Sequence, residues 1–349
     1  MRIHNRGLLV WCVVSSAFLG CSSDGGPAGG DSMDMSTGGD PLKVESVSKR
    51  AAACSGAPGA ASRCEAYDVV CEGLPAAVVE VAYYNRTAGT SDKGSIVFGS
   101  GGDGTGFYNY TQTKRLLDAG YNVIDRRWPA GWFTAGTAGP QQTACRLAAL
   151  LRYLRASVAP TGAFCATGNS GGSAELSYAL TWQGAGKVLD FALPSSGPFH
   201  RLDLACQGET DAAWKAQCQM LISTRCPDCQ SRICQLGNGP RSLIDNSFSA
   251  LPKCSAATAM DLATLKTLGP AQGPNAATLD GAPVRFLTGK DDSGAYAPLQ
   301  TALHDALKAS GASVEILYVT GAPHEMDTTS AGANAIFDAL STRCVPRAK

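Results

Sequence analysis

The chain has 349 residues and little charge. Asp, Glu, Lys and Arg make up only 17% of it, and 29 basic residues balance 29 acidic ones. A chain without net charge offers no basic field to attract nucleic-acid phosphates and no acidic field to hold many cations. We therefore expect no nucleic acid among its partners.

Long apolar runs are missing after the first 20 residues, so no later stretch is long enough to span a bilayer. Near the N-terminus, Arg2, His4 and Arg6 precede an apolar run from Leu8 to Leu19. Basic residues followed by a short apolar run are typical of a secretory signal. The sequence predicts a signal peptide over residues 1–20.

Gly20-Cys21 ends this run and resembles the junction of a bacterial lipoprotein signal, in which the Cys becomes lipidated. Residues 22–42 contain neither Lys nor Arg and bury too little apolar surface to fold. We expect a flexible tether over residues 21–50 and membrane contact through the lipid anchor only. The protein is then an outer-membrane or cell-surface lipoprotein. An ordinary signal peptide, giving a periplasmic or secreted protein, is the alternative.

Cysteine, in contrast, is abundant, with 14 residues. A cytosolic protein rarely has so many unless they bind metal. Cys12 leaves with the signal and Cys21 is assigned to lipid, so twelve remain, an even number as six disulfides require. Cys226 and Cys229 have the spacing of zinc ligands. In an exported chain we expect disulfides and no bound metal.

From about residue 75, short β-branched runs alternate with segments of helical periodicity, which is typical of an α/β protein with a mainly parallel sheet. Predicted strands cover residues 77–84, 95–98, 121–125, 163–167, 188–193, 284–288 and 314–319. Predicted helices cover residues 111–119, 143–157, 173–182, 299–309 and 331–340. The intervening region 194–283 is rich in Cys, Gly, Pro and Ser and interrupts the alternation.

A G-x-S-x-G motif, Gly168-Asn169-Ser170-Gly171-Gly172, lies between a predicted strand and a predicted helix. In this place the motif holds a nucleophilic serine on a sharp, strained turn with its Oγ exposed. Such a pentapeptide is weak support in a chain with 40 glycines, where a simple strand-to-helix turn is the alternative. The order of strand, turn and helix favours Ser170 as a nucleophile.

A serine nucleophile needs a base, usually histidine, and the chain has only four histidines. One leaves with the signal peptide. His304 lies in a predicted helix, where a solvated or capping role is expected. His324 lies in a loop after the last predicted strand, and such loops often carry catalytic residues. We therefore expect His324 to be the base.

The carboxylate that orients the base should follow the preceding strand. Asp291 and Asp292 both do. We choose Asp292, which lies three residues after Gly289, and keep Asp291 as the second choice. One of the two is expected to be a solvated or loop-stabilising group.

Backbone N–H groups must also face the developing oxyanion. The glycine-rich segment Phe98–Gly104 follows a strand upstream of the motif, so we expect Gly101 and Gly102, with Gly171, to form the oxyanion hole. A flexible loop or a phosphate cradle is the alternative. No Walker lysine follows and the G-x-G-x-x-G pattern does not fit, so we expect no cofactor.

These residues, in the chain order Ser170, Asp292, His324, resemble the α/β-hydrolase superfamily in its secreted serine esterase and lipase branches. The resemblance covers about residues 75 to 345. It implies a mostly parallel eight-stranded sheet flanked by helices, a Ser-His-Asp mechanism and a Cys-rich cap over residues 197–282 of a domain spanning 51–349. In one departure, Phe98-Gly99-Ser100-Gly101 stands where lipases of this fold often have His-Gly-Gly-Gly.

The resemblance implies an exported carboxylic-ester hydrolase that acts through an acyl-enzyme on a small or polymeric ester. The candidate substrate contacts are Phe107, Tyr108, Trp132, Phe133 and His200. Loop packing is the alternative role for the aromatic residues, and locking the cap is the alternative for His200. A serine peptidase or acyltransferase of the same fold and a non-catalytic surface binding lipoprotein remain as alternative functions. The natural ester and the oligomeric state stay open.

Overall fold

The computed structural model describes residues 45–347 except 53, 135–138, 198–199, 208–209, 232–233, 235–237 and 295. The predicted signal peptide, Cys21 and most of the predicted tether lie outside the described residues. The structure described below belongs to a single compact unit, Lys43–Lys349.

A nine-stranded sheet forms the centre of this unit, in the order β1-β2-β3-β5-β4-β6-β7-β8-β9. The strands are β1 (Ser46–Lys49), β2 (Arg63–Val70), β3 (Ala77–Tyr84), β4 (Gly94–Gly99), β5 (Tyr121–Arg127), β6 (Ala163–Asn169), β7 (Phe191–Ser195), β8 (Val284–Gly289) and β9 (Val314–Val319). The six strands from β5 to β9 in this order are parallel, while β1, β2 and β3 pair antiparallel. The prediction of a mostly parallel α/β sheet is confirmed.

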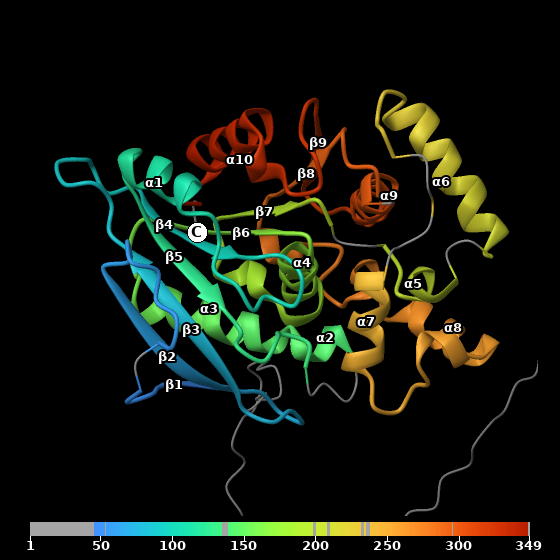
Figure 1. Cartoon of the computed structure of the whole chain (residues 1–349), viewed down its shortest axis with the longest axis horizontal. Coiled ribbons are helices and arrows are strands. Elements are labelled where there is room, and N and C mark those ends of the chain that lie inside the picture. The colour runs from blue at the N-terminus through green and yellow to red at the C-terminus, as the bar shows by residue number, and fades with distance from the viewer. Residues whose placement is uncertain are drawn as a thin grey trace, which may run out of the picture. The chain divides into compact units, whose positions relative to one another are not determined.

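Helices cover both faces of the sheet (Figure 1). The core helices are α1 (Tyr110–Asp118), α2 (Pro140–Thr143), α3 (Cys145–Ser157), α4 (Gly171–Gln183), α9 (Tyr296–Ala309) and α10 (Ser330–Arg343). Apolar residues of α1 and α10 share one core cluster, and those of α3, α4 and α9 share another. Two covered faces explain why the parallel strands read as nearly continuous apolar runs in the sequence.

The sheet has nine strands where eight were expected. The extra strand β1 lies within the segment predicted as a tether and pairs antiparallel with β2, from Ser46 opposite Val70 to Lys49 opposite Tyr67. Neither strand stands out in the sequence, because both lie toward the antiparallel edge, where charged and apolar side chains mix. The ordered sheet therefore begins before the predicted end of the tether.

The strand predicted over residues 188–193 is β7, which covers Phe191–Ser195 and so begins later in the chain. Helix α4 ends at Gly184, which adopts a left-handed conformation with φ 67°, and a 3-10 turn follows over Ala185–Lys187. Leu189 is fully buried in the loop before β7. Its side chain packs in the core, although the residue does not belong to the strand.

The region between β7 and β8 forms the expected Cys-rich insertion. Its helices are α5 (Asp203–Gln207), α6 (Ala212–Arg225), α7 (Asn238–Ser247) and α8 (Ala259–Thr267). The insertion also contains the 3-10 helices η2 (Cys254–Ala256), η3 (Pro270–Gln272) and η4 (Leu279–Gly281). Outside it, η1 (Ala185–Lys187) precedes β7 and η5 (Met326–Thr328) follows β9. Three disulfides are internal to the insertion: Cys206–Cys254, Cys218–Cys234 and Cys226–Cys229.

The other three disulfides join parts of the sheet unit: Cys54–Cys64, Cys71–Cys145 and Cys165–Cys344. All twelve cysteines that follow the predicted lipid anchor are therefore paired, in agreement with the expected six disulfides. The alternative zinc site at Cys226 and Cys229 is wrong, because a disulfide sulfur is no longer a thiolate ligand.

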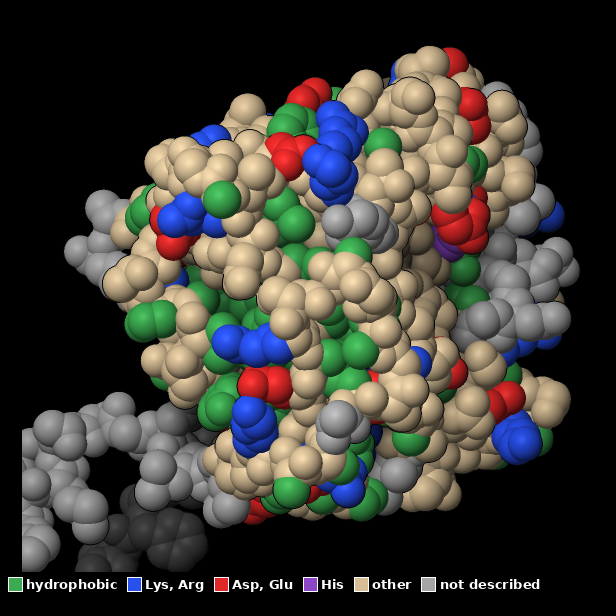
Figure 2. Space-filling model, turned by 60° about the vertical axis from the view of Figure 1, so that its left-hand side comes forward, with side chains coloured by type: hydrophobic (Ala, Val, Ile, Leu, Met, Phe, Trp, Pro, Cys, Tyr) green, Lys and Arg blue, Asp and Glu red, His purple; other side chains and the backbone are tan. Residues whose placement is uncertain are grey.

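No helix among the described residues is long and apolar enough to cross a membrane. The face shown in Figure 2 carries Lys and Arg side chains interspersed with Asp and Glu side chains, without a large area of one sign. This mixture agrees with the balanced charge of the sequence.

Candidate active site

Ser170 lies at the sharp turn between β6 and α4. Its φ of 50° and ψ of −114° are unusual for a residue with a side chain and cost about 1–3 kcal/mol. The Ser170 N–H donates to the carbonyl of Ser195 at 2.9 Å, which fixes the turn against β7. A Cβ on Gly172 would lie 2.4 Å from the carbonyl oxygen of Ser100, so only glycine permits this close approach of helix and loop.

His324 faces Ser170 from the loop after β9. Its Nε2 lies 2.8 Å from the Oγ of Ser170. The ring of Tyr296, at the start of α9, packs against the imidazole with 4.3 Å between the ring centroids. This stacking and partial burial, with 22% of the His324 side chain exposed, restrict the orientation of the imidazole.

Asp292 holds the other side of the imidazole from the loop after β8. Its Oδ2 lies 2.9 Å from Nδ1 of His324, and its Oδ1 accepts a hydrogen bond from the N–H of Gly294 at 2.8 Å. The carboxylate is 3% exposed. Because a carboxylate accepts only, Nδ1 carries the proton and Nε2 is free to accept one from Ser170.

The structure thus brings together Ser170, His324 and Asp292, which the sequence places far apart. It distinguishes between the two candidate aspartates, because Nδ1 of His324 contacts Asp292. The backbone N–H of Asp291 donates to the carbonyl of Ala322 at 3.0 Å, which joins the loop that carries Asp292 to the loop that carries His324.

Gly102 and Gly171 lie against each other beside Ser170. A Cβ on Gly171 would be 1.8 Å from the carbonyl oxygen of Gly102 and 3.0 Å from its nitrogen. Gly171 is the first residue of α4, so its N–H has no partner within the helix. The loop after β4 and the start of α4 therefore meet directly beside Ser170, without a side chain between them.

Gly101 has a different part in the same loop. Its carbonyl accepts the N–H of Gly104 at 3.1 Å, which closes a tight turn around Gly102. A Cβ on Gly101 would lie 3.3 Å from Cβ of Ser170, so the loop passes directly over the serine. All three glycines predicted for the oxyanion hole, Gly101, Gly102 and Gly171, therefore lie beside Ser170.

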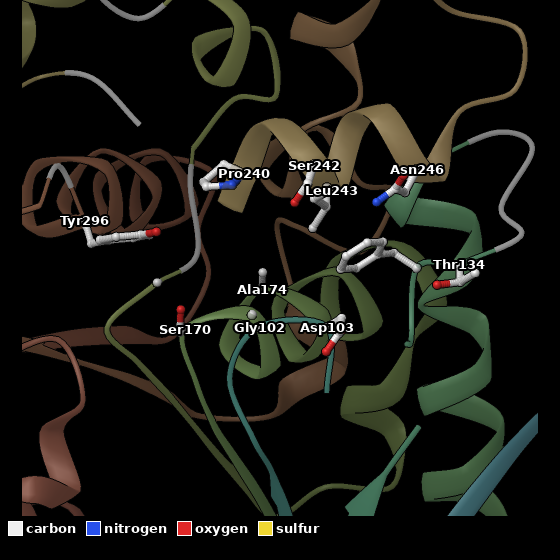
Figure 3. A pocket seen from close by; sticks show the side chains of 13 residues that line it. Gly102, Asp103, Thr134, Ser170, Ala174, Pro240, Ser242, Leu243, Asn246 and Tyr296 are labelled. Carbon is white, nitrogen blue, oxygen red and sulfur yellow. The ribbon is translucent and has the colours of Figure 1, made fainter. Parts of the chain in front are cut away.

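A first cavity, of about 380 Å³, opens beside Ser170. In Figure 3 the side chains of Ser242, Leu243 and Asn246 on α7 point toward Gly102 and Ala174 on the opposite wall, and Tyr296 lies at one end. Phe133 and Thr134 also line this cavity. One wall therefore comes from the insertion and the other from the sheet unit.

The helix α7 is fixed in place. Nε of Arg241 donates to the carbonyl of Ala205 at 3.1 Å, and Oδ1 of Asp245 accepts the N–H of Cys254 at 2.8 Å. The disulfide between Cys206 and Cys254 closes the same loop. Polar contacts thereby attach the cavity wall to α5 and η2, and the disulfide joins α5 and η2 to each other.

The candidate substrate contacts divide into two groups. Phe133 lines the first cavity, as predicted. Trp132 does not, because it is fully buried behind Phe133, and its ring packs edge-on against it at 5.2 Å. His200 lines neither cavity near Ser170, and its backbone carbonyl packs against Gly269 in the insertion. Burial, together with the charge of Arg201, lowers the pKa of His200 to about 4.

Phe107 and Tyr108 line a second cavity, of about 300 Å³, on the other side of Ser170. Glu325 and Asp327, from the loop that carries His324, lie on its wall. Ser170 and Gly102 line both cavities, so the two cavities meet beside Ser170. Burial raises the pKa of Asp327.

Asp125 on β5 fixes the segment that carries Tyr108. The N–H of Tyr108 donates to Oδ2 of Asp125 at 2.8 Å, and the Tyr108 ring packs against Phe98 at 4.7 Å. Asp125 is fully buried, and desolvation raises its pKa to about 8. A neutral carboxyl group there removes the cost of a buried charge.

Sequence reasoning missed Tyr296 and the α7 residues of the first cavity. Tyr296 follows Asp292 by four residues, and an aromatic residue so close to a candidate acid was a usable signal. The sequence gives no such signal for Leu243 and Asn246, because their place in the cavity depends on how the insertion folds against the rest of the chain. Among the described residues, no group of three or more His, Cys, Asp or Glu could hold a metal ion.

The sequence matches no family model, and no curated protein matches it. The fold, however, matches solved structures at low sequence identity. An uncomplexed acylaminoacyl peptidase from Pyrococcus horikoshii is 12% identical with a TM-score of 0.52, covering 79% of this chain and 41% of that one. This chain thus spans about two fifths of the peptidase.

Two smaller proteins are covered almost completely. A lipase in its open form is 16% identical with a TM-score of 0.51, covering 77% of this chain and 94% of that one. A truncated carbohydrate esterase from gut microbiota is 13% identical with a TM-score of 0.50, and the match covers 76% of this chain and 90% of the esterase. The sheet order, the flanking helices and these likenesses together show that the chain has the α/β-hydrolase fold.

Proposed function

We propose that the protein is a carboxylic-ester hydrolase in which Ser170 is the nucleophile. The contacts of His324 carry the proposal, because its Nε2 lies 2.8 Å from Ser170 Oγ and its Nδ1 lies 2.9 Å from Asp292 Oδ2. A nucleophile, a base and an orienting acid within hydrogen-bond distance form the arrangement that activates a serine.

Acylation begins when Oγ of Ser170 attacks the ester carbonyl carbon and His324 accepts the hydroxyl proton. The carbonyl oxygen becomes an oxyanion facing the N–H groups of Gly102 and Gly171. The tetrahedral intermediate then collapses, the bond to the alcohol oxygen breaks, and His324 gives its proton to the departing alcohol. The acyl group remains on Ser170.

Deacylation repeats these steps with water in place of the serine hydroxyl. His324 removes a proton from water, which attacks the acyl carbon, and the second tetrahedral intermediate releases the acid. The proton returns to Oγ of Ser170. Asp292 keeps the imidazole in one tautomer and stabilises the positive charge that forms on it in both halves.

The two cavities suit the two parts of an ester. The first cavity combines the apolar surfaces of Phe133, Ala174 and Leu243 with polar groups on α7. The second cavity, with Glu325 and Asp327, is the more acidic. We assign the acyl group to the first cavity and the alcohol to the second, because the alcohol receives its proton from the loop that carries His324.

Export and lipidation belong to the proposal as well. The apolar run before Cys21 and the six disulfides support an oxidising location, because disulfides are rare in the reducing cytosol. Expression with a radiolabelled fatty acid tests the anchor. The full chain should incorporate label and partition with membranes, and Cys21→Ser should do neither. Label retained by Cys21→Ser would contradict lipidation at this residue.

The function is tested with 4-nitrophenyl esters of increasing acyl length beside a panel of peptide amides, using Ser170→Ala as the control. Ester turnover that disappears in Ser170→Ala supports the hydrolase. Amide turnover without ester turnover indicates a serine peptidase, and acyl transfer to added alcohols without hydrolysis indicates an acyltransferase. Absence of all three in correctly oxidised protein indicates a binding protein.

A further inference from the structure

A buried ion pair that takes no part in the triad lies behind the glycine-rich loop. Nη2 of Arg126, at the end of β5, is 2.7 Å from Oε2 of Glu175 on α4. The two side chains are 2% and 0% exposed. Removing two charges from water is costly, and the pair adds little stability compared with apolar residues of similar size. A role in shaping the neighbouring loop gives a reason for its presence.

Trp128 completes this group. Its indole Nε1–H donates to the other carboxylate oxygen of Glu175 at 2.9 Å. The ring is 1% exposed, so the hydrogen bond is shielded from water. Oε1 of Glu175 therefore accepts the hydrogen bond from Trp128, while Oε2 lies at ion-pair distance from Arg126.

Trp128 in turn holds the loop that contains Gly102. Its backbone N–H donates to the carbonyl of Gly104 at 2.8 Å. Its ring lies so close that a Cβ on Gly104 would be 3.2 Å from Cδ1. The N–H of Trp132 makes the next contact, with the carbonyl of Asp103 at 2.9 Å. The loop is thus fixed by two backbone hydrogen bonds, from Trp128 and from Trp132.

Glu175 lies on the helix that begins with Gly171. The two residues are four positions apart, about one helical turn, and therefore lie on the same side of α4. Through Glu175, the Trp128 contact joins the helix that carries one predicted oxyanion donor to the loop that carries the other.

We propose that Glu175 and Trp128 are positioning residues that set the separation of the Gly102 and Gly171 amides in the oxyanion hole. This inference rests on the proposed ester hydrolysis. Neither side chain touches the substrate. We expect these residues to affect kcat more than KM. A donor displaced from the oxyanion stabilises the transition state less, while binding of the ground-state ester hardly changes.

The test is Trp128→Phe, which removes the indole N–H and keeps an aromatic ring. We expect kcat to fall about tenfold, with KM changed less than twofold, because the donor is displaced and not deleted. Affinity for a boronic acid that mimics the tetrahedral intermediate should fall by the same factor as kcat/KM. If the variant instead lost folded protein, the active fraction would fall. The analogue would still bind the remaining folded protein as tightly as it binds the wild type.

Trp182→Phe is the matched control. It removes an indole N–H that donates to the carbonyl of Gly269 at 3.1 Å, and it lies at the other end of the same helix. We expect its kcat and analogue affinity to stay within twofold of the wild type. If Trp128→Phe does not fold, 3-benzothienylalanine at position 128 keeps the bicyclic shape without the donor and makes the same test.

The outcomes separate the two proposals. An active wild type with an equally active position-128 variant overturns the positioning role and leaves the hydrolase intact. A tenfold loss in both Trp128→Phe and Trp182→Phe also overturns it, since any indole N–H on this helix would then matter equally. A wild type that hydrolyses no ester overturns the proposed function, and the positioning role with it.

Discussion

Gly171 and Gly102 pack so closely that a single methyl group on Gly171 would lie 1.8 Å from the carbonyl oxygen of Gly102. The helix that follows Ser170 and the loop after β4 therefore meet without a side chain between them. This contact lies within the predicted oxyanion hole, so the proposed activity should be sensitive to substitution there.

Gly171→Ala should lower kcat by about a hundredfold or more, because the methyl group forces apart the two amides that face the oxyanion. Steady-state kinetics on a 4-nitrophenyl ester measures this. Gly59→Ala is the control, since a Cβ at Gly59 meets nothing within 4 Å, and its kcat should match the wild type. Full activity in Gly171→Ala would show that the oxyanion donors lie elsewhere.

Replacing the acid of the triad should separate the two adjacent aspartates. Asp292→Asn should lower kcat by about ten-thousandfold, because an amide can hold the imidazole in the wrong tautomer. Asp291→Asn should keep kcat within about threefold, because the Asp291 contact to Ala322 is made by the backbone N–H. The reverse order of the two variants would assign the acid to Asp291.

His200 should make stability depend on pH in a defined window. Its pKa is about 4 in the folded chain against 6.5 for the unperturbed group, so between these values the unfolded chain binds more protons. The free energy of unfolding should therefore fall as the pH decreases from 6.5 to 4, by about 3 kcal/mol from this group.

Urea unfolding of the wild type and His200→Gln at several pH values measures the effect. The variant should lose less stability than the wild type over this window, because only the wild type takes up the extra proton on unfolding. Parallel stability curves for the two proteins would contradict the assignment of the proton to His200.

The acidic second cavity should affect the choice of alcohol. An ester of choline should have a higher kcat/KM than an ester of glycolate with the same acyl group, by about fivefold, as expected for partly exposed charges. The comparison is made at alkaline pH, because burial raises the pKa of Asp327 and the proposed effect needs its ionised form. The Glu325→Gln, Asp327→Asn double variant should remove the difference. A preference unchanged in that variant would place the alcohol outside this cavity.

The residues of the predicted triad could be found from the sequence because their chemistry leaves few candidates. The chain has four histidines, of which one lies in the predicted signal peptide and one in a helix, so His324 was chosen for its loop after the last predicted strand. The choice between Asp291 and Asp292 was harder, because adjacent loop residues point in different directions that only backbone geometry fixes. Local chemistry thus indicates which residue types act, and tertiary structure selects among neighbours.

Features that depend on distant contacts could not be predicted. β1 becomes a strand by pairing with the edge of β2, and Trp132 is fully buried where its ring packs against Phe133. The wall formed by Leu243 depends on α7, which long-range contacts and a disulfide hold in place. The Glu175–Trp128 hydrogen bond joins residues 47 positions apart and has no local sequence signal.

The central claim is that Ser170 is an activated nucleophile. Incubation of the oxidised protein with a fluorophosphonate, followed by intact mass measurement and peptide mapping, tests it most directly. We expect one covalent adduct per chain, on Ser170, with ester hydrolysis lost in proportion to labelling, and no adduct on Ser170→Ala. An unlabelled wild type, or an adduct on another residue with Ser170 unmodified, would contradict the account.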